Sequence, residues 1–122
     1  METIILKDLP PPNGHYSHAV RHNDTLYVSG ILPGGLSPDS SLQEQFTRVF
    51  DTIESILANS GATLNQVVSC HIYTPDLEMW PEINRLYAER LGEHKPARVV
   101  VPVKELHFGY KLEVEVVVAL ER

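Results

Sequence analysis

The apolar positions of the chain recur at helical spacing in two segments. In the first, Ser41 and Glu44 form the S-x-x-E pattern of a capping box, and Asn-Ser-Gly at 59–61 predicts the end of the helix. The second helix is expected to begin at the capping residue Asp76 and to end at Gly92. The first stripe consists of Phe46, Val49, Phe50, Ile53, Ile56 and Leu57, and the second of Trp80, Ile83, Tyr87 and Leu91.

Segments rich in β-branched and aromatic residues predict strands. A strand near the N-terminus is expected to precede a hairpin that turns at residues 22–25, and loops are expected at residues 10–14 and 30–39. Helices between strands favour crossover connections on a single sheet. The other strands are predicted at residues 16–21, 26–29, 67–73, 97–103 and 111–120.

Two of the predicted strands are apolar on both faces, at Val99-Val100-Val101 and at Val116-Val117-Val118-Ala119. Strands of this kind are typically covered on both faces, whereas two helices cover only one face of a sheet this wide. We therefore expect the second face to contact another subunit. The alternative is a mildly apolar face in contact with water, which is common.

The composition indicates one globular domain spanning residues 1–122. Hydrophobic residues make up 43% of the chain and charged residues 21%, which argues against a disordered chain. The formal net charge is −6, which argues against a protein that mainly binds nucleic-acid backbones. A small anionic substrate remains compatible with this charge, because one arginine suffices to bind a carboxylate.

The chain contains one cysteine, so no intramolecular disulfide can form. This favours an intracellular, cytoplasmic protein. The N-terminal residues lack the basic start and the cleavage site of a signal peptide, and no apolar run approaches the length of a membrane span. No membrane partner is therefore expected.

Arg98 is a charged residue within an apolar strand. Burial of a guanidinium is costly unless the group is paired. Arg98 is therefore expected to pair with a protein carboxylate, to bind the carboxylate of a ligand, or to lie in water at the edge of the sheet. Its planar donors suit a bidentate contact with a carboxylate.

Glu113 and Glu115 are two positions apart in the last strand and share one face of it. Such a pair is commonly a solvated polar face. Here Val117 and Ala119 continue the same face, so the carboxylates lie at a half-buried boundary, where one of them can hold a water molecule or pass a proton.

The histidines and the cysteine carry less information. His15 and His18 are spaced like metal ligands, but an extended chain points residues three apart in opposite directions, so no metal site is expected. Cys70 is predicted to be a small core residue, and the adjacent His71 points to the other face of its strand.

Several motifs along the chain match one known family. The most specific is C-terminal, where Pro96-Ala97-Arg98 precedes Lys104, Leu106 and Leu112-Glu113. Over nearly its whole length the chain resembles the RidA/YjgF family of reactive intermediate (enamine/imine) deaminases. The other matching segments are Gly14-x-Tyr16-Ser17-x-Ala19-Val20, Leu26-Tyr27-Val28-Ser29-Gly30, Asn84-x-x-Tyr87-Ala88 and Gly92-x-His94.

The resemblance implies an α+β, chorismate-mutase-like fold with a mixed six-stranded sheet and two helices on one face. It also implies a homotrimer with active sites in the clefts between subunits. By the same resemblance Arg98 holds the substrate carboxylate, Glu113 positions the hydrolytic water, and Glu115 is a second, less directly implicated glutamate. The implied substrate-binding residues are Tyr16, Gly30, Ile31, Asn84 and Val100.

The chain departs from the family at several of these positions. Many members have cysteine where this chain has Val100, glutamine where it has Ile31, and proline where it has His15. These changes affect the identity of the substrate more than the reaction, because backbone groups at position 100 can still bind a ligand.

The resemblance implies a hydrolytic deaminase that converts 2-imino or 2-enamino acids to 2-oxo acids and ammonia without a metal or an organic cofactor. One variant is a deaminase for a larger enamine such as an aminomuconate. Another is a trimer that binds 2-oxo acids without catalysis. A ribonuclease, an activity also attached to this family, is disfavoured by the net charge of −6.

Overall fold

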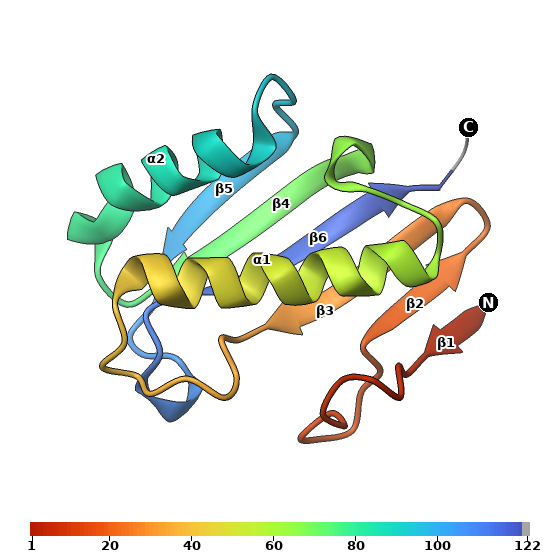
Figure 1. Ribbon diagram of the computed structural model, residues 1–122, viewed down its shortest axis with the longest axis horizontal. Helices are drawn as coiled ribbons and strands as arrows, with labels where there is room; N and C mark the ends of the chain where they lie inside the picture. Colours follow the sequence, from red (N-terminus) through yellow and green to blue (C-terminus); the bar gives the residue numbers. More distant parts are fainter. Residues whose placement is uncertain (121–122) are drawn as a thin grey trace.

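The computed structural model describes residues 1–120, which form a six-stranded sheet with two helices on one of its faces (Figure 1). The helices are α1 (Leu42–Asn59) and α2 (Trp80–Leu91). Three short 3-10 turns, η1, η2 and η3, span Leu64–Gln66, Leu77–Met79 and His107–Gly109. The strands are β1 (Glu2–Ile4), β2 (Ala19–His22), β3 (Thr25–Ile31), β4 (Val67–Thr74), β5 (Ala97–Pro102) and β6 (Glu113–Ala119).

The sheet is mixed, as expected, with the strand order β1-β2-β3-β6-β4-β5. β4 and β5 are parallel and are connected through α2, whereas every other neighbouring pair is antiparallel. The last strand, β6, therefore lies in the middle of the sheet, between β3 and β4. The strands that carry Arg98 and Glu113 are separated by β4.

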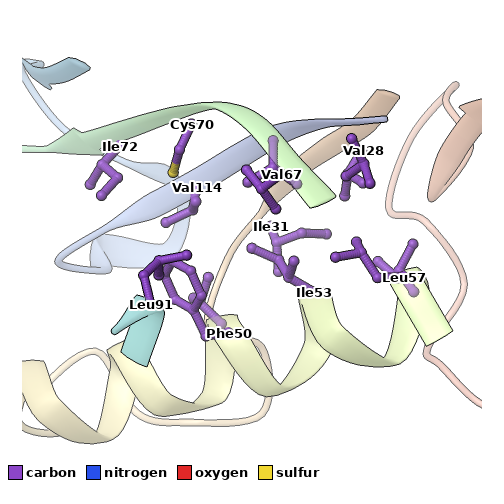
Figure 2. Packing of buried hydrophobic residues seen from close by; sticks show 14 of the residues in the cluster. Val28, Ile31, Phe50, Ile53, Leu57, Val67, Cys70, Ile72, Leu91 and Val114 are labelled. Carbon is purple, nitrogen blue, oxygen red and sulfur yellow. The ribbon is translucent and has the colours of Figure 1, made fainter. Parts of the chain in front are cut away.

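The first helix forms as its sequence predicts. The Ser41 hydroxyl accepts a hydrogen bond from the Glu44 backbone N–H at 3.0 Å, and the Glu44 carboxylate accepts one from the Ser41 N–H at 2.9 Å. The apolar stripe of α1 packs against the sheet, and Figure 2 shows Phe50, Ile53 and Leu57 directed at the strands. The core thus lies between the helices and one face of the sheet.

The second helix begins later than predicted. Asp76 caps the short turn η2, where its carboxylate accepts from the Glu78 N–H, and α2 itself begins at Trp80. Trp80 was expected in the buried stripe, but 40% of its surface is exposed. The buried residues of the helix are Ile83, Leu86, Tyr87 and Leu91, so its buried stripe begins at Ile83.

The ends of two strands also differ from expectation. β2 begins at Ala19, so Tyr16 belongs to the preceding loop. β3 continues beyond the expected loop boundary through Gly30 to Ile31, after an irregularity in its pairing with β6. Because the irregularity shifts the register by one residue, Ile31 turns into the core beside Val28.

The face of the sheet opposite the helices is apolar and partly open. Tyr27 and Val99 are 48% and 44% exposed on it, and Val101, Val117 and Ala119 are half-buried. This pattern matches the two-faced strands seen in the sequence. No helix within residues 1–120 is both long and apolar enough to cross a membrane.

Candidate active site

Arg98 lies in β5 and extends beneath α2. Its Nη1 donates a hydrogen bond to Asn84 Oδ1 at 3.0 Å. Its guanidinium carbon lies 4.8 Å from the centroid of the Tyr87 ring and 5.8 Å from that of Trp80. The Asn84 amide and two aromatic rings therefore orient the guanidinium, and none of these groups carries a negative charge that would neutralise it.

Within residues 1–120, no carboxylate lies within ion-pair distance of Arg98. The half-buried side chain lines a cavity of about 470 Å³, together with Asn84, Tyr87 and Lys95. A guanidinium has five N–H donors, and the contact with Asn84 occupies one of them. The others are available to an anionic ligand, and Lys95 adds a second positive charge to the same cavity.

Glu113 begins β6 and is half-buried against the backbone of β3. A Cβ atom at position 30 would overlap with the Glu113 carboxylate, so glycine is what allows this close approach. The Glu113 carboxylate therefore lies directly beside Gly30, so the structure brings these two predicted site residues together although they are distant in the sequence.

Burial raises the pKa of Glu113 above its usual range, and the neighbouring Glu115 charge raises it further, while His107 acts in the opposite direction. Glu115 accepts a hydrogen bond from the Tyr73 hydroxyl. That hydrogen bond is the main reason why the pKa of Tyr73 is raised to about 12. Tyr73 therefore remains a proton donor to Glu115 at neutral pH.

Tyr16, Gly30 and Ile31 line a second cavity, of about 350 Å³. Its outer wall is the proline-rich loop, which His18 holds in place. The Nδ1 atom of His18 accepts from the Leu6 N–H at 3.0 Å, and the Nε2 atom hydrogen-bonds to the Pro10 carbonyl at 2.9 Å. His18 is thus buried as a structural residue of this loop.

Arg98 and Glu113 project from opposite faces of the sheet. Arg98 is paired with Cys70 across β4 and β5, and Cys70 is buried in the core under the helices. Glu113 alternates with the core residue Val114 and shares the open face with Glu115. One protomer therefore does not bring the two residues together. The predicted residues fall into two groups, one with Arg98, Asn84 and Val100 and one with Tyr16, Gly30, Ile31 and Glu113.

Some neighbours of these residues were not anticipated. Tyr87 is one turn of α2 beyond Asn84, so helical spacing predicts that the two residues share one face of the helix. The sequence pattern does not predict that this face contacts Arg98. Tyr73 reaches Glu115 through the pairing of β4 with β6. This contact joins residues 42 positions apart, and no local pattern predicts it.

Cys70 lies in β4, between the strands that carry Arg98 and Glu113, but its thiol is buried. It is 1% exposed, and burial raises its pKa to about 12. A thiol in this state is a poor nucleophile. Within the described part of the chain, no three His, Cys, Asp or Glu side chains are grouped so as to hold a metal ion.

Known proteins share both the sequence and this fold. A family model described as endoribonuclease L-PSP matches residues 6–120. A 3-aminoacrylate deaminase, RutC, from Acinetobacter baylyi is 38% identical over 106 residues, which cover 84% of this chain and 84% of the relative. The chain belongs to the RidA/YjgF family. The family membership that the motifs predicted is therefore confirmed.

Other members of the RidA/YjgF family are similar over the full length. A RutC family protein from Pyrococcus abyssi is 35% identical over 122 residues, which cover 95% of this chain and 94% of the relative. The crystal structure of RidA from the Antarctic bacterium Psychrobacter superimposes with a TM-score of 0.89 at 31% identity, covering 98% of this chain and 99% of the other. The expected α+β, chorismate-mutase-like fold is thus confirmed.

Proposed function

We propose that the protein is a hydrolytic deaminase of 2-imino and 2-enamino acids. The observation that carries this proposal is the guanidinium of Arg98, which lines a cavity and has no carboxylate partner within residues 1–120. A half-buried, oriented cation of this kind suits the carboxylate of an amino-acid-derived substrate. The similarity to a 3-aminoacrylate deaminase favours the same reaction class.

We further propose that the working site is assembled from two copies of the chain in a homotrimer. Arg98 and Glu113 lie on opposite faces of one protomer, so a substrate that contacts both needs a second protomer. The apolar open face, with Tyr27 and Val99 exposed, is suited to such an interface. Such an assembly would bring Arg98 of one protomer close to Glu113 of another.

In the proposed reaction Arg98 binds the substrate carboxylate and Glu113 holds a water molecule near the imine carbon. The water oxygen bonds to that carbon, and a water proton passes through the Glu113 carboxylate to the imine nitrogen. The resulting carbinolamine forms its C=O bond, breaks its C–N bond and transfers the hydroxyl proton to the departing nitrogen. The products are a 2-oxo acid and ammonia. Positioning contributes most of the acceleration, since an imine is already electrophilic.

The net charge of −6 argues against RNA as the substrate, despite the description of the family model. Phosphate backbones require clustered positive charge, and the chain has 10 basic residues against 16 acidic ones. The cations of the Arg98 cavity are sufficient for a single carboxylate.

The proposal is tested by supplying freshly generated imino acids and measuring 2-oxo acid release. We expect Arg98→Ala and Glu113→Ala each to lose most of the activity. Arg85→Ala and Glu89→Gln are matched controls, because these two residues form an exposed ion pair on the outer side of α2. Full activity in Arg98→Ala, or 2-oxo acid binding without any deamination by the wild type, would contradict the proposal.

A further inference from the structure

The cavity beside Glu113 has an unusual lining. It measures about 350 Å³, within the range of ligand pockets, and is bounded by the proline-rich loop, the end of β3 and the turn η3. None of its lining residues is Asp, Glu, Lys or Arg. Its one histidine, His18, is tied to the backbone, because its Nδ1 accepts a hydrogen bond from the Leu6 N–H. The lining side chains are therefore largely apolar, and the charged groups next to the cavity include the Glu113 carboxylate against Gly30 and the Arg48 guanidinium, which donates to the Gly34 carbonyl.

Phe108 lines this cavity and has a backbone conformation that is unfavourable for phenylalanine. Its φ is +63°, in the left-handed region, and its surface is 57% exposed. The ring stacks on His107 at 4.7 Å and meets the Tyr110 ring edge-on at 6.1 Å. An exposed aromatic ring contributes little to the core, and asparagine or glycine would adopt this backbone more easily. Strain combined with exposure points to a role in ligand binding.

The cavity adjoins the proposed reaction centre. Gly30 lines it, and the Glu113 carboxylate lies against Gly30. His107, which stacks on Phe108, acts electrostatically on Glu113. A substrate whose imine carbon lies near the water held by Glu113 would therefore lie close to Gly30, which is part of the cavity lining.

We infer that this cavity receives the substrate side chain, that the preferred substrates are 2-imino acids with aromatic or branched aliphatic side chains, and that Phe108 is a specificity-determining residue. This inference rests on the proposed deaminase function. It disfavours an enamine with a second carboxylate, such as an aminomuconate, because no lysine or arginine lines the cavity to pair with that carboxylate, which would lose its hydration.

The test compares imino acids generated in place from phenylalanine, leucine, alanine and glutamate by an amino-acid oxidase. We expect kcat/KM for the phenylalanine- and leucine-derived imines to exceed that for the alanine-derived imine by about tenfold or more, with the glutamate-derived imine lowest. A wild type that favours the alanine- or glutamate-derived imine would overturn the inference while leaving deamination intact.

Phe108→Gly separates selectivity from folding, because it removes the ring and also relieves the strained backbone. We expect an unchanged or higher Tm and loss of most of the preference for large side chains over the alanine-derived imine. Phe108→Leu should retain part of that preference. An unaltered preference in Phe108→Gly would overturn the role of Phe108.

Calorimetry with phenylpyruvate and pyruvate repeats the comparison without turnover. Tighter binding of phenylpyruvate than of pyruvate, with a loss of this difference in Phe108→Gly, would support the inference. If the same protein hydrolyses no imine, only the proposed deamination fails. Equal affinities for the two acids would overturn the inference.

Discussion

The carboxylate of Glu113 lies against the backbone of Gly30, so closely that a methyl group at position 30 would overlap with it. The contact joins the first residue of β6 to a residue near the end of β3. In the proposed reaction, this contact sets where the water molecule held by Glu113 lies relative to the neighbouring cavity. The absence of a side chain at Gly30 is therefore a geometric requirement of the proposed site.

Gly30→Ala should reduce activity much more than stability. The atom that the new methyl group meets is the end of a flexible side chain, so Glu113 can move to another rotamer at a cost of about 1 kcal/mol. Displacement of its carboxylate by about 1 Å is expected to lower kcat/KM by up to about 100-fold. Steady-state kinetics and thermal unfolding measure the two effects.

The Gly30 prediction has an internal control. In a Glu113→Ala background the new methyl group has no carboxylate to displace, so adding Gly30→Ala should lower the residual activity little further. Equal losses in both backgrounds would show that position 30 acts independently of Glu113.

The Glu113–Glu115 pair predicts a dependence of the rate on pH. In the proposed reaction Glu113 has to be ionised to accept a proton from water, and both burial and Glu115 raise its pKa. Glu115→Gln removes the second cause, so the acidic limb of kcat/KM should move to lower pH. Because His107 lowers the pKa of Glu113, His107→Ala should move the limb the opposite way. Rate profiles of the three proteins check both directions, and identical limbs would show that another group titrates.

The raised pKa of Glu113 also predicts a stability effect. A carboxyl whose pKa is higher in the folded state contributes stability below its unfolded pKa and loses it as the pH rises through the folded pKa. Ionised Glu113 therefore destabilises the fold at neutral pH, and Glu113→Gln should raise the Tm there. The gain should vanish below about pH 4, where the carboxyl is protonated in both states. Glu89→Gln, at an exposed position of α2, should show no such gain.

How much of this fold is predictable depends on the range of the interactions involved. The helix α1 follows from local signals, since the capping box at Ser41 and the apolar stripe lie within its own residues. The bounds of β3 do not, because its last residue, Ile31, pairs with Val114 only after a register shift. The exposure of Trp80 likewise depends on which part of α2 packs against the core, and the spacing of apolar residues within α2 does not indicate this.

The candidate site shows the same division. Alternation along one strand indicates which residues share a face, and it grouped Glu113 with Glu115 correctly. It cannot relate the faces of two strands, because that relation depends on their pairing with β4. The opposite orientations of Arg98 and Glu113 therefore emerged only from the structure, and so did the hydrogen bond between Tyr73 and Glu115.

Cys70 provides a final prediction, because its position beside Arg98 in the sheet would otherwise suggest a nucleophile. Burial raises the pKa of its thiol to about 12, so a thiol reagent at pH 8 should react slowly with the folded protein and rapidly after unfolding in guanidinium. Cys70→Ala should lose about 1 kcal/mol of stability from the small cavity it leaves, with kcat/KM unchanged. Rapid modification of the folded protein together with loss of activity would instead assign the thiol to the reaction, and the proposed water held by Glu113 would have to be abandoned.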